Sequence, residues 1–174
     1  MELTADAVLS FGREIVFAAY RDELTELVKY LPNVRRIEVV SREGEGGVVR
    51  LHNVWHGGGE IPAAARAFLS EAMLTWDDHA TWDEARWCCA WRIATRSFTE
   101  AVRCEGENRF VEIDGGTRLE IRGVLAIDAG KIRGVPRLLA GKVAATVEAL
   151  LVEKIRPNLV ETAASLRKHL EAKR

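Results

Sequence analysis

Hydrophobic and polar residues alternate at the start of the chain, and their spacing changes soon afterwards. Apolar side chains occupy every second position from Leu3 to Phe11, which predicts a half-buried strand over Glu2 to Phe11. After Gly12 the apolar residues recur at helical spacing in two short runs, and Pro32 ends the second run. We therefore expect one strand followed by two short helices.

Six further extended segments follow as three hairpins. The predicted pairs are Val34–Arg42 with Val48–His56, Met73–Trp82 with Arg86–Thr95, and Thr99–Ile113 with Arg118–Ile127. Each pair is joined by a polar or glycine-rich turn, and Asp114-Gly115-Gly116 is the strongest hairpin signal among them. With the first strand, these segments predict a seven-stranded antiparallel sheet.

Two further segments have helical spacing. Gly57-Gly58-Gly59 leads into a short segment, Pro62–Met73, which predicts an inserted helix after the third strand. From Pro136 onwards one apolar stripe predicts a long C-terminal helix, and Pro157 predicts a kink in it. The stripe consists of Leu139, Val143, Val147, Leu150, Leu151, Ile155, Leu159, Ala163, Leu166 and Leu170.

The order of these elements predicts an α+β fold with a ligand cavity. A twisted sheet of seven strands curls, and one helix crossing its concave face does not fill the space between them. The element order, the glycine-rich hairpin after the second strand and the closing amphipathic helix resemble the START-like superfamily with its helix-grip fold. That superfamily includes pollen-allergen-type proteins, polyketide cyclases and lipid-transfer proteins.

The resemblance spans nearly the whole chain. It implies an apolar or amphipathic ligand held between the sheet and the last helix, and no obligatory cofactor. The stretch from Asp83 to Phe98 is also similar to PRELI-like intracellular phospholipid carriers.

Composition agrees with one ordinary globular domain over residues 1–174. Hydrophobic residues make up 48% of the chain and charged residues 29%. Lys and Arg total 25 against 26 for Asp and Glu, so no overall charge attracts nucleic acid or an anionic membrane. No apolar run approaches the ~20 residues that a membrane helix requires, and stable membrane insertion is therefore not expected.

The N-terminus and the cysteines suggest where the protein resides. The N-terminal residues do not resemble a secretory signal. Cys88, Cys89 and Cys104 are odd in number, which suits reduced thiols better than a disulfide framework. Both observations favour a cytoplasmic location.

All five tryptophans lie between positions 55 and 91, and strand alternation places several of them on one face of the predicted sheet. We assign this face to the concave side. The predicted ligand-binding residues are Leu51, Asn53, Trp55, Trp76, Asp78, Trp87 and Trp91 from the strands, with Leu139, Val143 and Val147 from the C-terminal helix. Aromatic area with a few polar groups is typical of a small-molecule site, although the same rings could simply fill the core.

Asn53 and Asp78 are polar members of otherwise apolar faces and could hydrogen-bond a ligand head group. If Asp78 faces inward it needs a partner or a raised pKa. The alternative is a local twist or bulge that places it at a solvent-facing strand end. Glu100 and Glu112 raise the same question.

Motif searches reveal no catalytic residue, metal site or cofactor site. His52 and His56 are four residues apart on one strand face, or ~13 Å, too far to bind one metal ion, and we expect both to be exposed opposite the pocket. His56-Gly57-Gly58-Gly59 resembles an esterase oxyanion loop, but no Gly-x-Ser-x-Gly motif accompanies it. No glycine pattern matches a dinucleotide or phosphate loop.

Three functional hypotheses follow. The first is a noncatalytic binder or carrier of a hydrophobic small molecule, lipid-like or aromatic. The second is a cyclase-like or dehydratase-like enzyme that uses a pocket acid or base such as Asp78. The third is an interaction module that docks a partner through the helix end beyond Pro157. A second copy of the chain, giving a homodimer, is a further candidate partner.

Overall fold

Seven strands form a single antiparallel sheet in the computed structural model, which describes residues 1–58, 74–96, 100–128, 131, 141, 145 and 161–174. The strand order is β1-β7-β6-β5-β4-β3-β2. The strands are β1 (Glu2–Leu9), β2 (Val34–Glu45), β3 (Val48–Gly57), β4 (Thr75–Asp83), β5 (Cys88–Thr95), β6 (Val102–Ile113) and β7 (Gly116–Ile127). The predicted α+β fold and its sequential antiparallel hairpins are confirmed.

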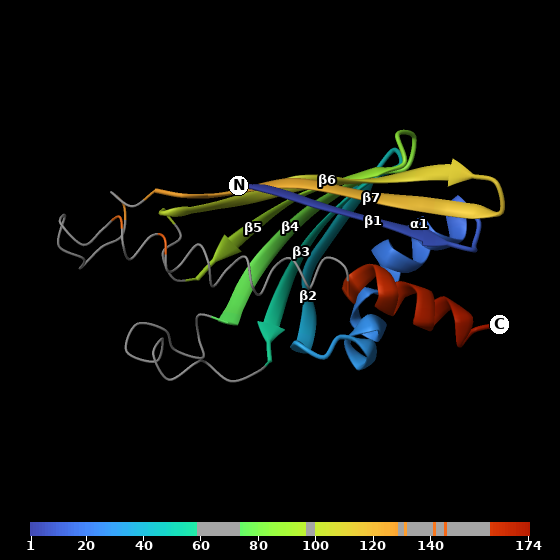
Figure 1. Cartoon of the computed structure of the whole chain (residues 1–174), viewed down its shortest axis with the longest axis horizontal. Coiled ribbons are helices and arrows are strands. Elements are labelled where there is room, and N and C mark those ends of the chain that lie inside the picture. The colour runs from blue at the N-terminus through green and yellow to red at the C-terminus, as the bar shows by residue number, and fades with distance from the viewer. Residues whose placement is uncertain (59–73, 97–99, 129–130, 132–140, 142–144, 146–160) are drawn as a thin grey trace.

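Helices gather on one side of this sheet, towards one of its ends (Figure 1). They are α1 (Arg13–Asp22), η1 (Leu24–Tyr30) and a helix over residues 161–171. The second predicted short helix is a 3-10 helix, and it buries Leu24 and Leu27. We call the sheet face that carries these helices the inner face, and the opposite one the outer face.

The C-terminal helix continues the predicted apolar stripe where it is described. Ala163, Leu166 and Leu170 are buried in the same core cluster as the sheet residues. The remainder of the predicted long helix, the kink at Pro157 and the inserted helix over Pro62–Met73 lie outside the described residues. No helix in the described segments is both long and apolar enough to span a membrane.

Strand register determines which side chains share the inner face. Leu51 pairs with Ala80 and Asn53 with Asp78, and Trp55 pairs with Trp76 across β3 and β4. Because side chains alternate between faces along a strand, these pairs form successive rows on one face. Leu51, Trp55 and Ala80 belong to the core cluster, which identifies that face as the inner one.

The hairpin between β4 and β5 differs from the prediction. The sequence pattern places Trp87 on a strand face with Trp91, but β5 begins at Cys88 and Trp87 lies in the preceding turn with a φ of 52°. Asp83 Oδ1 accepts a hydrogen bond from the Arg86 backbone at 3.0 Å, which favours a turn over further strand pairing. The prediction that Trp87 belongs to the strand is therefore wrong, although its ring packs on Phe17 and lies on the same side of the sheet as Trp91.

Candidate functional site

One end of the inner face is filled by aromatic rings from α1 and the sheet. Phe17 packs edge-to-face on Trp82 at 5.2 Å, on Trp87 at 5.2 Å and on Phe110 at 5.0 Å. Tyr20 adds a similar contact with Trp82 at 5.3 Å. Such pairs stabilise a core beyond the area they bury. We call this cluster of Phe17, Tyr20, Trp82, Trp87 and Phe110 the closed end.

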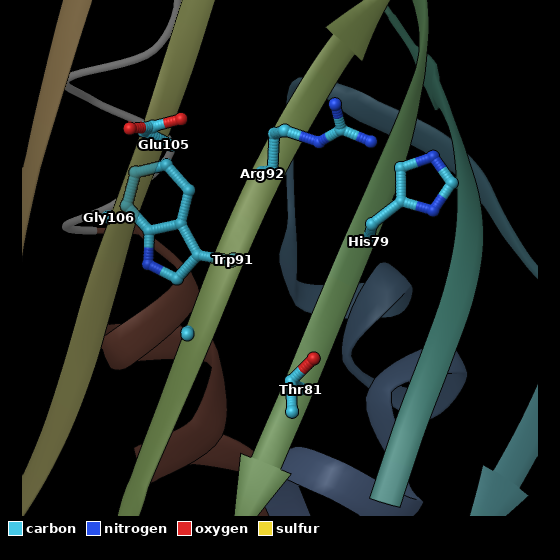
Figure 2. A pocket seen from close by; sticks show the side chains of 7 residues that line it. His79, Thr81, Trp91, Arg92, Glu105 and Gly106 are labelled. Atoms are coloured by element: carbon cyan, nitrogen blue, oxygen red, sulfur yellow. The ribbon is translucent and has the colours of Figure 1, made fainter.

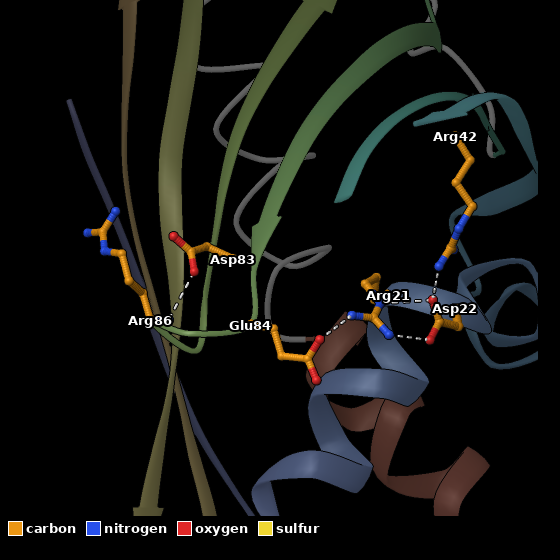
Figure 3. Close-up of polar contacts among 6 residues, drawn as sticks. All are labelled: Arg21, Asp22, Arg42, Asp83, Glu84 and Arg86. Atoms are coloured by element: carbon orange, nitrogen blue, oxygen red, sulfur yellow. Dashed lines mark hydrogen bonds and ion pairs between the residues drawn. The ribbon is translucent and has the colours of Figure 1, made fainter. Parts of the chain in front are cut away.

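Ion pairs fasten α1 across the closed end (Figure 3). Asp22 at the end of α1 accepts a hydrogen bond from Arg42 of β2 at 2.7 Å. Arg21 pairs with Asp22 at 2.9 Å and lies 3.7 Å from Glu84 in the β4–β5 turn. The helix is thus connected to β2 and to the β4–β5 turn by ion pairs, in addition to its apolar contacts.

The C-terminal helix is tied to the same end of the molecule. His169 Nε2 lies 2.5 Å from Glu23 Oε2, and Ser165 Oγ donates a hydrogen bond to the Tyr30 carbonyl at 3.0 Å. Arg167 donates to the Val8 carbonyl at 2.8 Å. Residues 161–171 are therefore held against η1, the residue between α1 and η1, and β1.

Trp91 lies in the middle of the inner face, against two glycines. A Cβ at Gly106 would approach the Trp91 ring to 2.4 Å, and one at Gly123 to 2.6 Å. The missing side chains on β6 and β7 let the indole lie flat across both strands. Its Nε1 donates a hydrogen bond to Asn108 Oδ1 at 2.9 Å, and the residue is 8% exposed. Trp91 therefore has a fixed position and a satisfied polar atom.

The other end of the inner face carries Asn53 and Asp78 beside a pair of indoles. Asn53 Nδ2 donates a hydrogen bond to Asp78 Oδ2 at 3.1 Å, and Asn53 is only 1% exposed. In the next row the rings of Trp55 and Trp76 stack with centroids 5.8 Å apart and planes inclined by 17°. We call these four residues the polar end.

Several buried polar atoms of the inner face have no hydrogen-bond partner in the described part of the chain. At the polar end these are the acceptor Asn53 Oδ1 and the donor Trp55 Nε1, and at the closed end the donor Trp82 Nε1. Buried polar groups in proteins are nearly always paired. The polar end is distinctive because an acceptor and a donor without partners lie beside a carboxyl group.

Asp78 faces inward and is half-buried. Burial raises its pKa to about 6, against the opposing influence of Asn53, Trp55 and His52. The pairing of β3 with β4 runs without a register shift from the Val48–Asp83 pair to the His56–Thr75 pair. The alternative in which a bulge turns Asp78 to solvent is therefore wrong. Glu100 and Glu112 are exposed, and Glu112 pairs with Arg13 at 3.2 Å.

The preceding residue, Asp77, points to the outer face and behaves in the opposite way. Burial acts to raise its pKa, but hydrogen bonds from His52 at 2.8 Å and Arg96 at 3.2 Å lower it below the ordinary value. Two adjacent carboxyl groups therefore have pKa values displaced in opposite directions, because His52 and Arg96 donate hydrogen bonds to the outer one, whereas burial outweighs the weaker influence of His52 on the inner one.

The predicted ligand-binding residues have different positions in the structure. Leu51, Asn53, Trp55, Trp76, Asp78 and Trp91 share the inner face as strand residues. Trp87 comes from a turn and packs on Phe17 in the closed end of the same face. Leu139, Val143 and Val147 lie outside the described residues. Pattern reasoning did not select Tyr20 and Asn108, whose side chains meet on the inner face. Tyr20 lies on the apolar stripe of α1, and Asn108 lies at an inward-facing alternate position of β6. These two patterns in the sequence could have indicated that both side chains face inward.

His52 and His56 lie on the outer face, as predicted, but they are half-buried and not exposed. His52 stacks on His79 with ring centroids 4.5 Å apart, and His56 lies 3.1 Å from Glu38. Within the described ranges no group of three or more His, Cys, Asp or Glu side chains could hold a metal ion.

An open hollow also lies on the outer face (Figure 2). It is lined by His79, Thr81, Ala90, Trp91, Arg92, Glu105 and Gly106. His79 and Thr81 come from β4, Arg92 from β5 and Glu105 from β6, all at outer-face positions. This hollow lies on the opposite face of the sheet from the predicted site, although the inner-face residue Trp91 contributes to its lining.

Comparison with known proteins supports the fold. No family model and no curated protein matches the sequence. The protein TTHA0849 from Thermus thermophilus is similar in structure, with a TM-score of 0.69 and 20% identity over 99% of each chain. The Zhui aromatase/cyclase from Streptomyces sp. R1128 is also similar, with a TM-score of 0.64 and 18% identity over 98% of this chain and 93% of that one.

Ara h 8.0201 is a third similar structure, with a TM-score of 0.56 and 12% identity over 99% of this chain and 98% of that one. The chain thus shares the fold of these structures, and the predicted helix-grip fold is confirmed. The closer likeness to PRELI-like carriers stays a prediction.

Proposed function

We propose that residues 1–174 form one domain that binds a hydrophobic small molecule, lipid-like or aromatic, at the polar end of the inner face. The observation that carries the proposal is the set of polar atoms there. Asn53 Oδ1 and Trp55 Nε1 are buried without partners in the described part of the chain, beside the stacked Trp55 and Trp76 rings. A few convergent polar groups among aromatic rings are characteristic of ligand pockets.

Apolar burial supplies the driving force in this proposal. Burial stabilises a complex by roughly 25 cal/mol per Å² of apolar surface removed from water, and the indoles of the polar end provide such surface. Leu139, Val143 and Val147, which lie outside the described residues, stay predicted members of the same site. The polar atoms of Asn53, Trp55 and Asp78 then orient the bound molecule.

Native mass spectrometry of the purified protein tests the proposal directly. We expect a copurified small molecule, or uptake of a member of a panel of acyl and aromatic compounds, accompanied by quenching of tryptophan fluorescence. Trp55→Leu should weaken that uptake, whereas Trp82→Phe at the closed end should not. A protein that binds no member of a broad panel would contradict the proposal.

A second candidate function is proton transfer in a cyclase-like or dehydratase-like enzyme. The observation that favours it is the Asp78 pKa of about 6, because a group that titrates near neutral pH can both accept and donate a proton. One structural neighbour is itself an aromatase/cyclase. On this hypothesis Asp78→Asn abolishes turnover of a reactive polycarbonyl substrate but leaves its binding intact; unchanged turnover would reject it.

The interaction-module hypothesis has less support. Ala163, Leu166 and Leu170 of the C-terminal helix are buried in the core, so the apolar face of residues 161–171 is already occupied. A homodimer stays a prediction, which sedimentation of the purified chain would test.

A further inference from the structure

The polar end presents hydrogen-bond acceptors that lack donors. Among the described residues, Asn53 Nδ2 donates a hydrogen bond to the Asp78 carboxyl group at 3.1 Å and Trp55 also acts on it as a donor, outside regular hydrogen-bond geometry, whereas an ionised carboxylate has about four acceptor sites. Asn53 Oδ1 is a second acceptor, buried and without a partner among the described residues. Asn53 is 1% exposed, so this is not an amide that solvent readily satisfies. A molecule that completes this cluster must bring N–H or O–H groups.

Within the described segments, the cluster also has no lysine or arginine beside it. Among the groups that act on Asp78 there, His52 is the one basic side chain. His52 lies on the outer face, where its Nε2 is 2.8 Å from Asp77. Partial removal of a carboxylate from water without a neighbouring cation is costly. A cationic ligand group would remove that cost.

Aromatic rings flank the carboxyl group. The stacked Trp55 and Trp76 side chains occupy the row next to Asn53 and Asp78, two residues or about 6.6 Å further along each strand. Trp76 is half-buried. Indole faces attract cations, most strongly where water is excluded. The rings therefore favour the same kind of ligand group as the carboxylate does.

Alternative head groups fit this arrangement less well. A fatty-acid carboxylate would bring a second negative charge beside Asp78, which is unfavourable at close range. An alcohol provides one donor and no charge. A protonated primary amine provides three donors and the missing positive charge, and charge-assisted hydrogen bonds are about twice as strong as neutral ones.

We infer that the ligand is an amphiphilic or aromatic amine whose ammonium group donates hydrogen bonds to Asp78 and Asn53 Oδ1 and lies against Trp76. Its apolar part extends over the inner face. The inference rests on the proposed function, since it names the ligand class for the same site.

Calorimetric titration of the full chain with decylamine, 1-decanol and decanoate tests the inference, because these probes share an alkyl chain and differ in head group. We expect decylamine to bind roughly tenfold more tightly than decanol, as a charge-assisted hydrogen bond implies, and decanoate to bind most weakly. Asp78→Asn should abolish the preference for the amine, with the decanol affinity changed by less than about threefold.

Asp77→Asn is the matched control, because it makes the same change at the neighbouring position on the outer face, and it should keep the preference for the amine. Asp78→Ser is a second variant with the same expected loss, in case the first does not fold. Equal binding of amine and alcohol, or tighter binding of decanoate, overturns the inference but leaves the proposed function standing. Failure of all three probes, together with an empty acyl and aromatic panel, overturns both.

Discussion

The two ends of the inner face use the same residue types for different purposes. At the closed end, Phe17 is surrounded edge-to-face by Trp82, Trp87 and Phe110. At the polar end, two stacked indoles lie beside Asn53 and an inward-facing carboxyl group whose pKa is raised. The first arrangement stabilises the fold, and the second costs stability. Groups that violate local packing rules in this way often mark functional sites.

The largest expected effect comes from breaking the closed end. Phe17→Ala removes the ring on which three others pack, and Phe17 is 2% exposed. We expect a loss of about 3–5 kcal/mol in the free energy of unfolding, the usual cost of such a truncation. Urea unfolding followed by circular dichroism measures it. A loss below about 1 kcal/mol would mean that the ring cluster does not hold the helices to the sheet.

The boundary between the two ends depends on Trp91 and its glycine support. A Cβ at Gly106 would lie 2.2 Å from the Arg122 carbonyl oxygen and 2.4 Å from the Trp91 ring. We expect Gly106→Ala to destabilise the fold by about 1–3 kcal/mol and to change the tryptophan emission. Gly141→Ala is the control, because a Cβ there meets no atom of the described residues within 4 Å. Equal stability of the two variants would refute the close-packing argument.

The sequence predicted side-chain positions correctly in the regular strands but not in the turn between β4 and β5. Alternation along β3 and β4 correctly predicted that Asn53, Trp55, Trp76 and Asp78 share one face, because a regular strand has a period of two. It failed at Trp87, since a left-handed residue in a four-residue turn leaves no period to detect.

Which tryptophans fill core could not be predicted either. That depends on contacts between segments far apart in sequence, such as Phe17 with Phe110 and Trp91 with Gly123. Local pattern carries information about the face on which a side chain lies, but not about the helix that later covers it.

Substitution of Asp78 at the polar end should raise the free energy of unfolding, whereas the substitutions at Phe17 and Gly106 lower it. Because burial raises the pKa of Asp78 from 3.8 to about 6, the folded protein binds a proton that the unfolded chain has released between those values. The free energy of unfolding therefore falls as pH rises through this window. We expect Asp78→Asn to be more stable than the parent by about 1–2 kcal/mol at about pH 8, with the difference largely gone below about pH 4.

Asp77→Asn provides the contrast, since its basic partners lower the pKa of Asp77 although burial opposes them. A carboxyl group whose pKa is lowered in the folded state stabilises the fold at pH values above its ordinary pKa. That contribution is lost as the pH falls through the lowered pKa of the folded state. The variant should therefore be less stable than the parent near neutral pH. Urea unfolding of both variants across pH decides the point, and the same sign for both would contradict the assignment of faces.

The smallest effect is expected at the rim of the closed end. Asp22→Asn weakens the pair with Arg42, whose side chains are 34% and 47% exposed. Exposed ion pairs contribute about 0–1 kcal/mol and are screened by salt. Thermal unfolding at low and high ionic strength should show a difference within that range that shrinks as salt is added. A larger, salt-independent loss would indicate that Asp22 has a structural role beyond this pair.

The central claim is that the polar end, and not the closed end, receives the ligand. Quenching by a long-chain alcohol brominated near its hydroxyl group tests it most directly, because bromine quenches only the indoles it touches. We predict that Trp82→Phe retains the quenching seen in the parent and that the double variant Trp55→Phe, Trp76→Phe loses most of it. The reverse result, or quenching unaffected by either change, would contradict the account.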